Sequence, residues 1–188
     1  RDLKPENFGL DGGGYLRLFD FGSAKVLPGD ATSNTMCGTP EYLSPEMITS
    51  KGHGRGTDIW SLGILLYELL TRKTPFYHPN SAMIYQQIMD SEEIMRVSFN
   101  KNFDPDACSL IKALLIVNPH MRLGMLRNGT EDLWVHPYFT KHGIRIEDVA
   151  KKRLPSPFKP LDISTQRTEL NDIIIGGFDT DTVPTYTG

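Results

Sequence analysis

The chain has 188 residues, 39% of them hydrophobic, which is ordinary for a single globular domain. Its net charge of −3 argues against a general binder of nucleic acids or other polyanions. Two cysteines are too few for a disulfide framework and favour a reducing compartment. No apolar run approaches the ~20 residues that a membrane-spanning helix needs, and no signal peptide is visible. Because the first residue is Arg1 rather than methionine, we expect a fragment of a longer protein.

Two short apolar runs, residues 8–10 and 15–19, flank a glycine-rich turn and predict a β-hairpin. Asn7 comes just before the first strand, and Asp20 just after the second. Because antiparallel strands lie about 4.8 Å apart, this turn should bring an amide oxygen and a carboxylate close together. Such oxygens are suitable ligands for Mg²⁺.

Asp2 and Lys4 lie on the approach to the same end of the hairpin. A carboxylate, an ammonium group and two metal ligands at one point are what phosphoryl transfer from a nucleotide needs. A purely structural domain is the plain alternative, but it does not explain why four polar residues converge at one hairpin end.

Residues 20–46 show little periodicity and are interrupted by glycine and proline, which predicts a long loop. Loops of this length in a compact domain are usually functional or mobile.

The strongest predicted helix covers residues 59–70, with Thr57 or Asp58 as its N-cap. It is apolar nearly all round, which predicts burial, so the charged Glu68 within it needs a partner. Further helices are predicted at residues 81–89 and 105–117, with a short one at 131–139. The composition changes at Lys151, and a proline-rich stretch at 155–160 predicts an extended segment. The remainder is polar apart from three isoleucines at 173–175, which predicts a tail that lies on the domain or is partly disordered.

Three motifs occur in a fixed order: Arg-Asp-Leu-Lys-Pro-Glu-Asn at 1–7, Asp-Phe-Gly at 20–22 and Ser-Pro-Glu at 44–46. They resemble the catalytic loop, the metal-binding triplet and the end of the activation segment of eukaryotic protein kinases. The resemblance implies an α+β protein-kinase-like fold: a mainly α-helical C-terminal lobe with a small β-hairpin at the active site, and no N-terminal lobe. It implies that residues 1–139 are this part of the catalytic domain and that residues 140–188 are a C-terminal tail, extended or partly disordered.

The resemblance also assigns catalytic roles. Asp2 is the base that positions a substrate hydroxyl, Lys4 balances the charge on the γ-phosphoryl group of ATP, and the Thr39 hydroxyl bridges the two. Asn7 and Asp20 are the expected ligands of Mg²⁺. Lys4, Asn7 and Asp20, together with Glu6, form the expected nucleotide site.

Supporting roles follow from the same resemblance. Asp58 is expected to bond to the backbone of the catalytic loop, and Arg122 to form a buried ion pair with Glu46.

Thr35 corresponds to the activation-loop phosphorylation site, and Arg1 and Lys25 are the cations expected to pair with its phosphate. The alternative is an unmodified surface threonine.

Lys4 within its motif and the Gly-Thr-Pro-Glu run at 38–41 are typical of serine/threonine kinases. Residues 118–124, 134–139 and 157–160 resemble the AGC group, within it the cyclic-nucleotide-dependent kinases, and the cGMP-dependent ones in particular. Glu6 and Glu68 then imply a protein substrate with basic residues before the target Ser or Thr. The resemblance also implies a cytoplasmic enzyme and leaves room for a regulatory cyclic-nucleotide-binding domain in the whole protein.

The sequence departs from the kinase pattern at Gly9, where a larger apolar residue usually lies under the adenine. The strands and helices that complete the nucleotide clamp are also missing, so we expect no phosphotransfer by this chain alone. Gly9 and an atypical tail leave a pseudokinase or interaction module as one alternative. A calcium/calmodulin-type kinase is the other.

Overall fold

The computed structural model describes residues 1–90, 99 and 103–158. The chain divides into two compact units, Arg1–Phe8 with Leu18–Leu154, and Gly9–Arg17 with the segment from Pro155 onward. The three isoleucines at 173–175 and the end of the proline-rich stretch lie outside the described residues.

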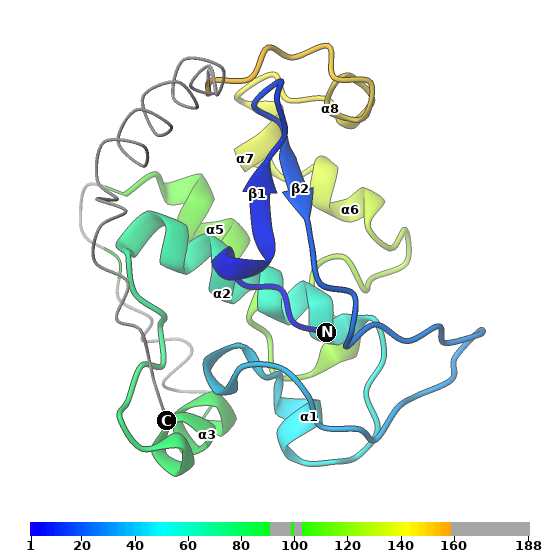
Figure 1. The fold of residues 1–188 in the computed structure, drawn as a ribbon, viewed down its shortest axis with the longest axis vertical. Helices are drawn as coiled ribbons and strands as arrows, with labels where there is room; N and C mark the ends of the chain where they lie inside the picture. Colours follow the sequence, from blue (N-terminus) through cyan, green and yellow to red (C-terminus); the bar gives the residue numbers. More distant parts are fainter. Residues whose placement is uncertain (91–98, 100–102, 159–188) are drawn as a thin grey trace, which may run out of the picture. The chain divides into compact units, whose positions relative to one another are not determined.

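The described residues are mainly helical, with one two-stranded hairpin, which confirms the expected fold class (Figure 1). The helices found here are too short or too polar to cross a membrane, as far as the described residues are concerned. In chain order the elements are η1 Pro5–Asn7, β1 Phe8–Leu10, β2 Leu16–Leu18, η2 Pro40–Tyr42, α1 Pro45–Ile48, α2 Gly56–Thr71, α3 Ser81–Met89, α5 Pro105–Leu114, η3 Pro119–Met121, α6 Glu131–Trp134, α7 Pro137–Thr140 and α8 Ile146–Ala150.

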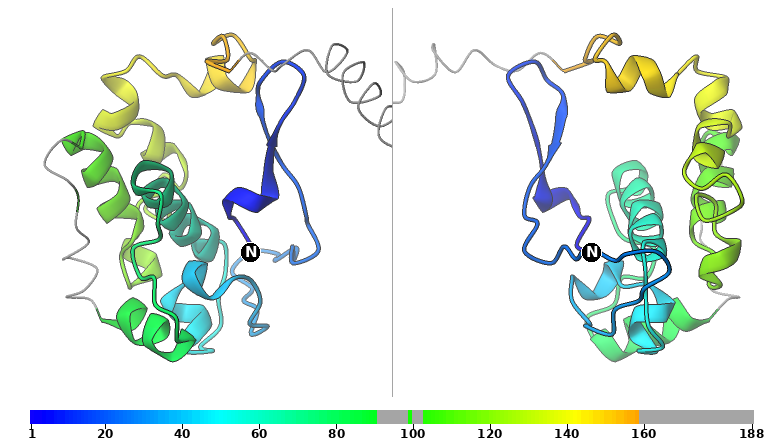
Figure 2. Two further views of the ribbon diagram at one scale, coloured as in Figure 1. Left: turned by 60° about the vertical axis from the view of Figure 1, so that its left-hand side comes forward. Right: turned by 90° about the vertical axis from the view of Figure 1, so that its right-hand side faces the viewer.

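Helix α2 is the centre of the larger unit. It packs against α5 and η2. Helices α2 and α5 lie side by side in both views of Figure 2. Trp60 and Ile64 of α2 are fully buried, as is Leu114 of α5. The helices approach closely at Gly63, where an added Cβ would lie 2.8 Å from the Leu115 side chain. A glycine in mid-helix is therefore explained by packing.

Helix α2 differs from its prediction at both ends. It begins at Gly56, so Thr57 and Asp58 lie in its first turn rather than at the cap, and the Thr57 hydroxyl donates to the Gly54 carbonyl at 3.0 Å. At the other end Leu69 is 64% exposed and Leu70 38%, so α2 is not buried all round.

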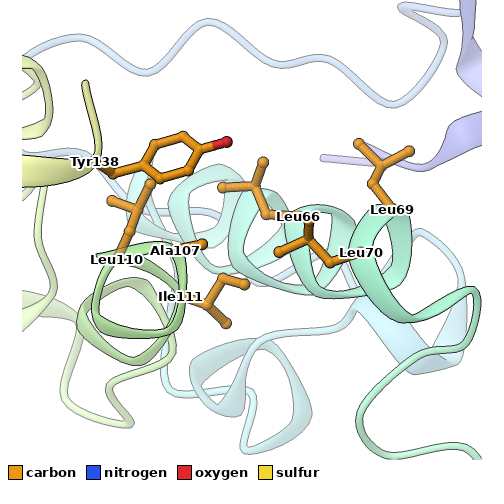
Figure 3. Close-up of a pocket in the computed structure, with 7 residues that line it drawn as sticks. All are labelled: Leu66, Leu69, Leu70, Ala107, Leu110, Ile111 and Tyr138. Atoms are coloured by element: carbon orange, nitrogen blue, oxygen red, sulfur yellow. The ribbon is translucent and has the colours of Figure 1, made fainter. Parts of the chain in front are cut away.

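An apolar pocket lies beside this exposed end of α2 (Figure 3). Leucines of α2 face residues of α5 across the pocket, and Tyr138 reaches into it from α7. Its lining residues are Leu66, Leu69, Leu70, Ala107, Leu110, Ile111 and Tyr138.

Helix α5 is shorter than predicted. It ends at Leu114 rather than at residue 117, because Leu115 leaves the helical conformation with ψ 46°. The carbonyl groups of Ile116 and Val117 are instead acceptors for the Arg122 guanidinium, at 2.9 and 3.3 Å. The buried Arg122 charge must have hydrogen-bond acceptors, and its use of these carbonyls accounts for the early end of the helix.

The remaining helices agree with the sequence in part. α3 has the predicted bounds, capped by the Asn80 side chain, which accepts from the Ala82 N–H at 2.9 Å. The single helix predicted at 131–139 is two short helices, α6 and α7, because His136 caps the second through its Nδ1. Helix α8 was not predicted.

The smaller unit joins the hairpin tip to the segment after residue 154. The Ser156 hydroxyl donates to the Gly14 carbonyl at 2.7 Å and accepts from the Phe158 N–H at 3.0 Å. Gly14 has φ 79°, and a Cβ there would lie 2.2 Å from the Phe158 carbonyl oxygen. Both the conformation and the close contact therefore require glycine.

Candidate active site

Three residues predicted for the site, Asp2, Lys4 and Thr39, meet in one hydrogen-bonded cluster. The Lys4 ammonium lies 3.0 Å from Asp2 Oδ2 and donates to the Thr39 hydroxyl at 2.9 Å. Both the hydroxyl and the main-chain N–H of Thr39 donate to Asp2 Oδ1 at 3.2 Å. These bonds tie residues 37 positions apart in the sequence into one closed cluster.

The electrostatics of this cluster favour the ionised carboxylate. Burial alone would raise the pKa of Asp2, but several donors oppose it. The hydrogen bond and charge of Lys4, with hydrogen bonds from Thr39 and Asn7, hold the pKa of Asp2 below its usual value. Asp2 is therefore an anion at neutral pH and a hydrogen-bond acceptor for a neighbouring hydroxyl.

Asn7 links this cluster to the hairpin. Its side-chain amide donates to the Asp2 carbonyl at 2.7 Å and to Asp2 Oδ2 at 3.2 Å. Its own carbonyl accepts from the Phe19 N–H at 2.7 Å, which closes the base of the hairpin next to Asp20. The buried Asn7 side chain is thus fixed, and its Oδ1 accepts no hydrogen bond from a described residue.

Asp20 occupies an unusual backbone conformation, with φ 53°. Non-glycine residues rarely adopt it, although aspartate does so more than most. Its Oδ1 accepts from the Gly22 N–H at 3.0 Å, and the residue is exposed. Within the described part of the chain, no hydrogen bond joins the Asp20 side chain to Asn7 or Asp2.

Two side-chain oxygen atoms near the base of the hairpin have the chemistry to bind a hard cation. Asn7 Oδ1 and Asp20 Oδ2 accept no hydrogen bond from the described residues, and amide and carboxylate oxygens are the ligands that Mg²⁺ prefers. Residues 1–90, 99 and 103–158 hold no cluster of three His, Cys, Asp or Glu side chains suited to a metal. A metal at the hairpin base would therefore depend on these two residues and on a ligand from outside the chain.

The predicted phosphate-binding cations meet at the Ser33 hydroxyl, and Arg1 Nη1 also donates to the Thr35 carbonyl at 3.5 Å. Arg1 Nη1 donates to the Ser33 hydroxyl at 3.1 Å, and Lys25 Nζ donates to it at 3.3 Å. Thr35 is exposed, and its main-chain N–H lies 3.4 Å from the same hydroxyl. In the unmodified chain, Ser33 therefore takes the donors that the sequence analysis assigned to a phosphate on Thr35.

His53 is a second member of this cluster that the sequence analysis missed. It is 2% exposed, pairs with Ser33 in an isolated β-bridge, and its Nε2 lies 3.4 Å from Arg1 Nη1. Burial, followed by the charge of Arg1, lowers the pKa of His53. Its sequence context is a glycine-rich connector that carried no functional signal.

Glu46 and Arg122 form the buried ion pair that the sequence predicted. Two parallel bonds of 2.9 and 3.0 Å join the guanidinium to the carboxylate. The guanidinium also donates to the Gly56 carbonyl at 2.5 Å and lies 5.2 Å from the centre of the Trp60 ring. All of its donors are therefore engaged inside the fold.

Asp58 lies where it can support the catalytic segment. Its Oδ1 is 3.3 Å from the main-chain nitrogen of Arg1, the residue before Asp2. This Oδ1 forms no hydrogen bond within the described residues, so the hydrogen bond expected between Asp58 and the backbone of the catalytic segment stays a prediction.

Glu68 has a neutral partner rather than a cation. Its carboxylate accepts a short hydrogen bond from the Tyr42 hydroxyl, and Glu41 likewise accepts from Thr74. Burial, and then the negative charges of Glu68, Glu6 and Glu41, raise the pKa of Tyr42 far above its usual value. Three carboxylates thus act electrostatically on one tyrosine, and the sequence analysis singled out two of them, Glu6 and Glu68.

The comparisons with known proteins agree with the motifs. A model of the protein kinase domain family matches residues 1–139. The chain is 46% identical over 160 residues to the mouse cAMP-dependent protein kinase catalytic subunit PRKX, covering 85% of this chain and 43% of that protein. Identity to yeast cAMP-dependent protein kinase type 3 is 41% over 160 residues, again 85% of this chain and 38% of the relative. For mouse cGMP-dependent protein kinase 2 it is 43% over 159 residues, 85% of this chain and 20% of the relative.

The chain thus spans less than half the length of the curated relatives it matches. These relatives are cyclic-nucleotide-dependent kinases of the AGC group, as the motifs implied. The chain belongs to the protein kinase family.

Proposed function

We propose that the whole protein is a serine/threonine kinase that transfers the γ-phosphate of ATP to a Ser or Thr hydroxyl of a protein substrate. The observation that supports this most is the Asp2 carboxylate held at once by Lys4, Thr39 and Asn7. Such a cluster orients an alcohol and tolerates the negative charge of a phosphoryl group beside it.

In this proposal Asp2 accepts a hydrogen bond from the substrate hydroxyl and aligns it for attack. Its lowered pKa makes it a weak base, so it takes the proton late, once the bond to phosphorus has begun to form. Placement and charge stabilisation therefore account for most of the catalysis.

Lys4 neutralises charge on the transferring phosphoryl group, and the Thr39 hydroxyl holds the side chains of Lys4 and Asp2 in position. The bond of 2.9 Å from Lys4 to the Thr39 hydroxyl supports this division of labour. Thr39 lies just before η2, so the activation segment and the catalytic residues are coupled at this point.

Asn7 and Asp20 would hold Mg²⁺, and Lys4 and Glu6 would complete this chain's share of the ATP site. A metal held there would offset the negative charge of the phosphates. Asn7 is the rigid partner, because its amide is fixed on Asp2 and its main chain on Phe19. Asp20 is the adjustable partner, because it is exposed and tied to Gly22 alone among the described residues.

The substrate would carry basic residues before the target hydroxyl. Glu6 is exposed, and Glu68 shares with it the electrostatic influence on Tyr42. Carboxylates in such an arrangement suit the guanidinium of an arginine side chain.

Phosphorylation of Thr35 would order the activation segment. Arg1 and Lys25 already point to Ser33, and the Thr35 N–H lies against the same hydroxyl. A phosphate there would compete for these donors with two negative charges in place of a neutral oxygen.

The remaining assignments concern the whole protein. Residues 140–188 would be the AGC-type tail following the catalytic domain, and a regulatory cyclic-nucleotide-binding domain would lie elsewhere in the whole protein. We place the enzyme in the cytoplasm. The 188-residue chain alone would lack phosphotransfer activity, because it supplies only half of the nucleotide clamp.

A pseudokinase is the rival with an observation in its favour, since Gly9 offers the adenine no side chain. A calcium/calmodulin-type kinase would differ in its regulator rather than in these residues.

The test is phosphotransfer by the whole protein from Mg²⁺-ATP to a peptide with two arginines before a serine. We expect transfer that stops on chelation of Mg²⁺ and falls by at least about 100-fold in Asp20→Asn. Asp30→Asn, an exposed aspartate of the same loop, is the matched control and should keep its rate. Nucleotide binding without any turnover would favour the pseudokinase.

A further inference from the structure

A single hydroxyl joins the tip of the hairpin to residues 155–158. The Ser156 hydroxyl donates to the Gly14 carbonyl at 2.7 Å and accepts from the Phe158 N–H at 3.0 Å. All three residues belong to the smaller unit, in which the serine and the glycine are 142 positions apart in the sequence. Ser156 is half-buried, while the residues on both sides of it are exposed. We call this pair of hydrogen bonds the tail latch.

The tail latch depends on the proton of the Ser156 hydroxyl. A carbonyl oxygen can only accept, so the bond to Gly14 exists because the serine donates. The two residues are also in close contact, since an added Cβ at Gly14 would lie 2.7 Å from Ser156 Oγ and 3.1 Å from Ser156 Cβ. A larger group on this oxygen, without a proton to donate, would therefore remove the bond and crowd the hairpin tip.

Ser156 also stands in a sequence that a protein kinase can recognise. Pro157 follows it directly, and Lys159 comes three residues after it. Proline lacks an N–H and restricts the residue before it to extended conformations, so an enzyme that accepts a Ser-Pro pair must be shaped for it. The second Ser-Pro pair of the sequence begins at Ser44, whose side chain is 0% exposed. Ser156 is therefore the Ser-Pro serine that an enzyme can reach.

We propose that Ser156 is phosphorylated by a proline-directed protein kinase and that the phosphate opens the tail latch. In this step a bond forms between Ser156 Oγ and the γ-phosphorus of ATP, while the bond from that phosphorus to the β–γ bridging oxygen breaks. ADP leaves, and the hydroxyl proton passes through the modifying enzyme to solvent. The modification is independent of the kinase function proposed above, because a separate enzyme and its ATP supply the phosphoryl group.

The change in charge explains why the modified latch stays open. A phosphate carries about −1.5 to −2 charges near pH 7, and its oxygens are acceptors. These oxygens would face the Gly14 carbonyl, which is itself an acceptor. The unmodified latch opens readily enough for an enzyme, because one neutral hydrogen bond contributes little net stability and the neighbouring residues are exposed. Phosphorylation therefore captures the open form and prevents it from closing.

The first measurement identifies the enzyme that modifies Ser156. The Asp20→Asn form of the whole protein, which is not expected to phosphorylate itself, is incubated with Mg²⁺-ATP and a cyclin-dependent kinase as the proline-directed enzyme. We expect mass spectrometry to locate phosphate on Ser156, at a rate at least about tenfold lower when Pro157→Ala is added. Pro155→Ala changes the exposed proline on the other side of the serine and is the matched control, so it should keep the rate.

The second measurement tests the latch itself, with phosphoserine incorporated at position 156 of the whole protein during translation. We expect hydrogen exchange in peptides covering residues 9–17 and 154–158 to be about 3- to 10-fold faster than in the unmodified protein. Ser156→Ala should have a similar effect, whereas Ser156→Thr keeps a hydroxyl and should exchange slowly. Phosphoserine in place of Ser109, an exposed serine of α5, is the matched control and should leave both peptides unchanged.

The inference would be overturned if the added kinase left Ser156 unmodified, or if Pro157→Ala were modified at the same rate. Unchanged hydrogen exchange with phosphoserine at position 156 would also overturn it. Cations at residues 151–153 precede the serine, so the protein itself is the rival enzyme. Phosphate on Ser156 in the active whole protein with Mg²⁺-ATP alone would overturn the assignment to a proline-directed kinase while supporting the proposed function.

Discussion

Two charged clusters in the larger unit use similar residues in opposite ways. Arg122 and Glu46 are almost fully buried and satisfy each other, with main-chain carbonyls taking the remaining donors. Asp2 and Lys4 are paired at a comparable distance of 3.0 Å, but their side chains are 15% and 23% exposed. One ion pair is closed to any further partner, and the other remains reachable.

We propose that this difference in burial separates a structural pair from a reactive one. In the closed pair, removal of either partner strands a charge in the protein interior. In the open cluster, solvent can screen what remains, so a substitution should affect chemistry more than folding. Substitutions can test this contrast, and the largest change in stability is expected at the closed pair.

The closed pair should dominate stability. We expect Glu46→Gln to lower the free energy of unfolding by about 3–5 kcal/mol, because it leaves the Arg122 charge buried without its counter-ion. Urea unfolding of the whole protein, followed by tryptophan fluorescence, measures this. Asp106→Asn removes the partly exposed partner of the exposed Lys141 and should cost no more than about 1 kcal/mol. A Glu46→Gln cost as small as that would remove the distinction between closed and open pairs.

The close contact between α2 and α5 at Gly63 should be sensitive to added volume. Gly63→Ala places a Cβ 2.8 Å from Leu115 Cδ2 and 3.0 Å from Leu114 Cβ. We expect a loss of about 1–3 kcal/mol from this overpacking. Gly54→Ala meets nothing within 4 Å and should change stability by less than about 1 kcal/mol in either direction. Equal unfolding midpoints for the two variants would show that α2 and α5 are not closely packed there.

The open cluster should respond in rate. Thr39→Val removes the hydroxyl shared by Asp2 and Lys4, and we expect phosphotransfer by the whole protein to fall about 10–100-fold. Thr39→Ser restores the hydroxyl and should recover most of the rate. Thr130→Val, at an exposed threonine without a capping bond, is the control. If Thr39→Val loses stability instead of rate, the cluster belongs with the structural pair.

The third cluster, around Ser33, should make the free energy of unfolding depend on pH. Because the pKa of His53 is lowered in the fold, the unfolded chain takes up the proton first. Stability should be complete above the unfolded value of about 6.5 and decline as the pH falls through the folded value. His53→Gln should make this decline shallower, while the exposed His120→Gln should not alter it. Part of the decline should persist, because the pKa of His136 is also lowered.

Much of the fold could be predicted because its signals are local. The glycine-rich turn predicted the hairpin, and the bounds of α3 followed from its apolar spacing. The Glu46–Arg122 pair came from a motif rather than from spacing, since 76 residues separate its members.

The errors have tertiary causes. Helix α5 ends early because the buried Arg122 guanidinium needs the carbonyls of residues 116 and 117. Ser33 and His53 carry no motif, and only the fold brings them together. Glu41 was not predicted as a site residue because no local pattern indicates that it bonds to Thr74. The bond from Tyr42 to Glu68 likewise depends on the fold.

The most direct test of this account is Asp2→Asn, measured in the whole protein for both rate and stability. The account predicts a phosphotransfer rate lower by about 100- to 10,000-fold, with a urea midpoint near that of the unmodified protein. Near-normal transfer, or a rate loss that merely follows unfolding, would contradict the claim that this open carboxylate carries the chemistry.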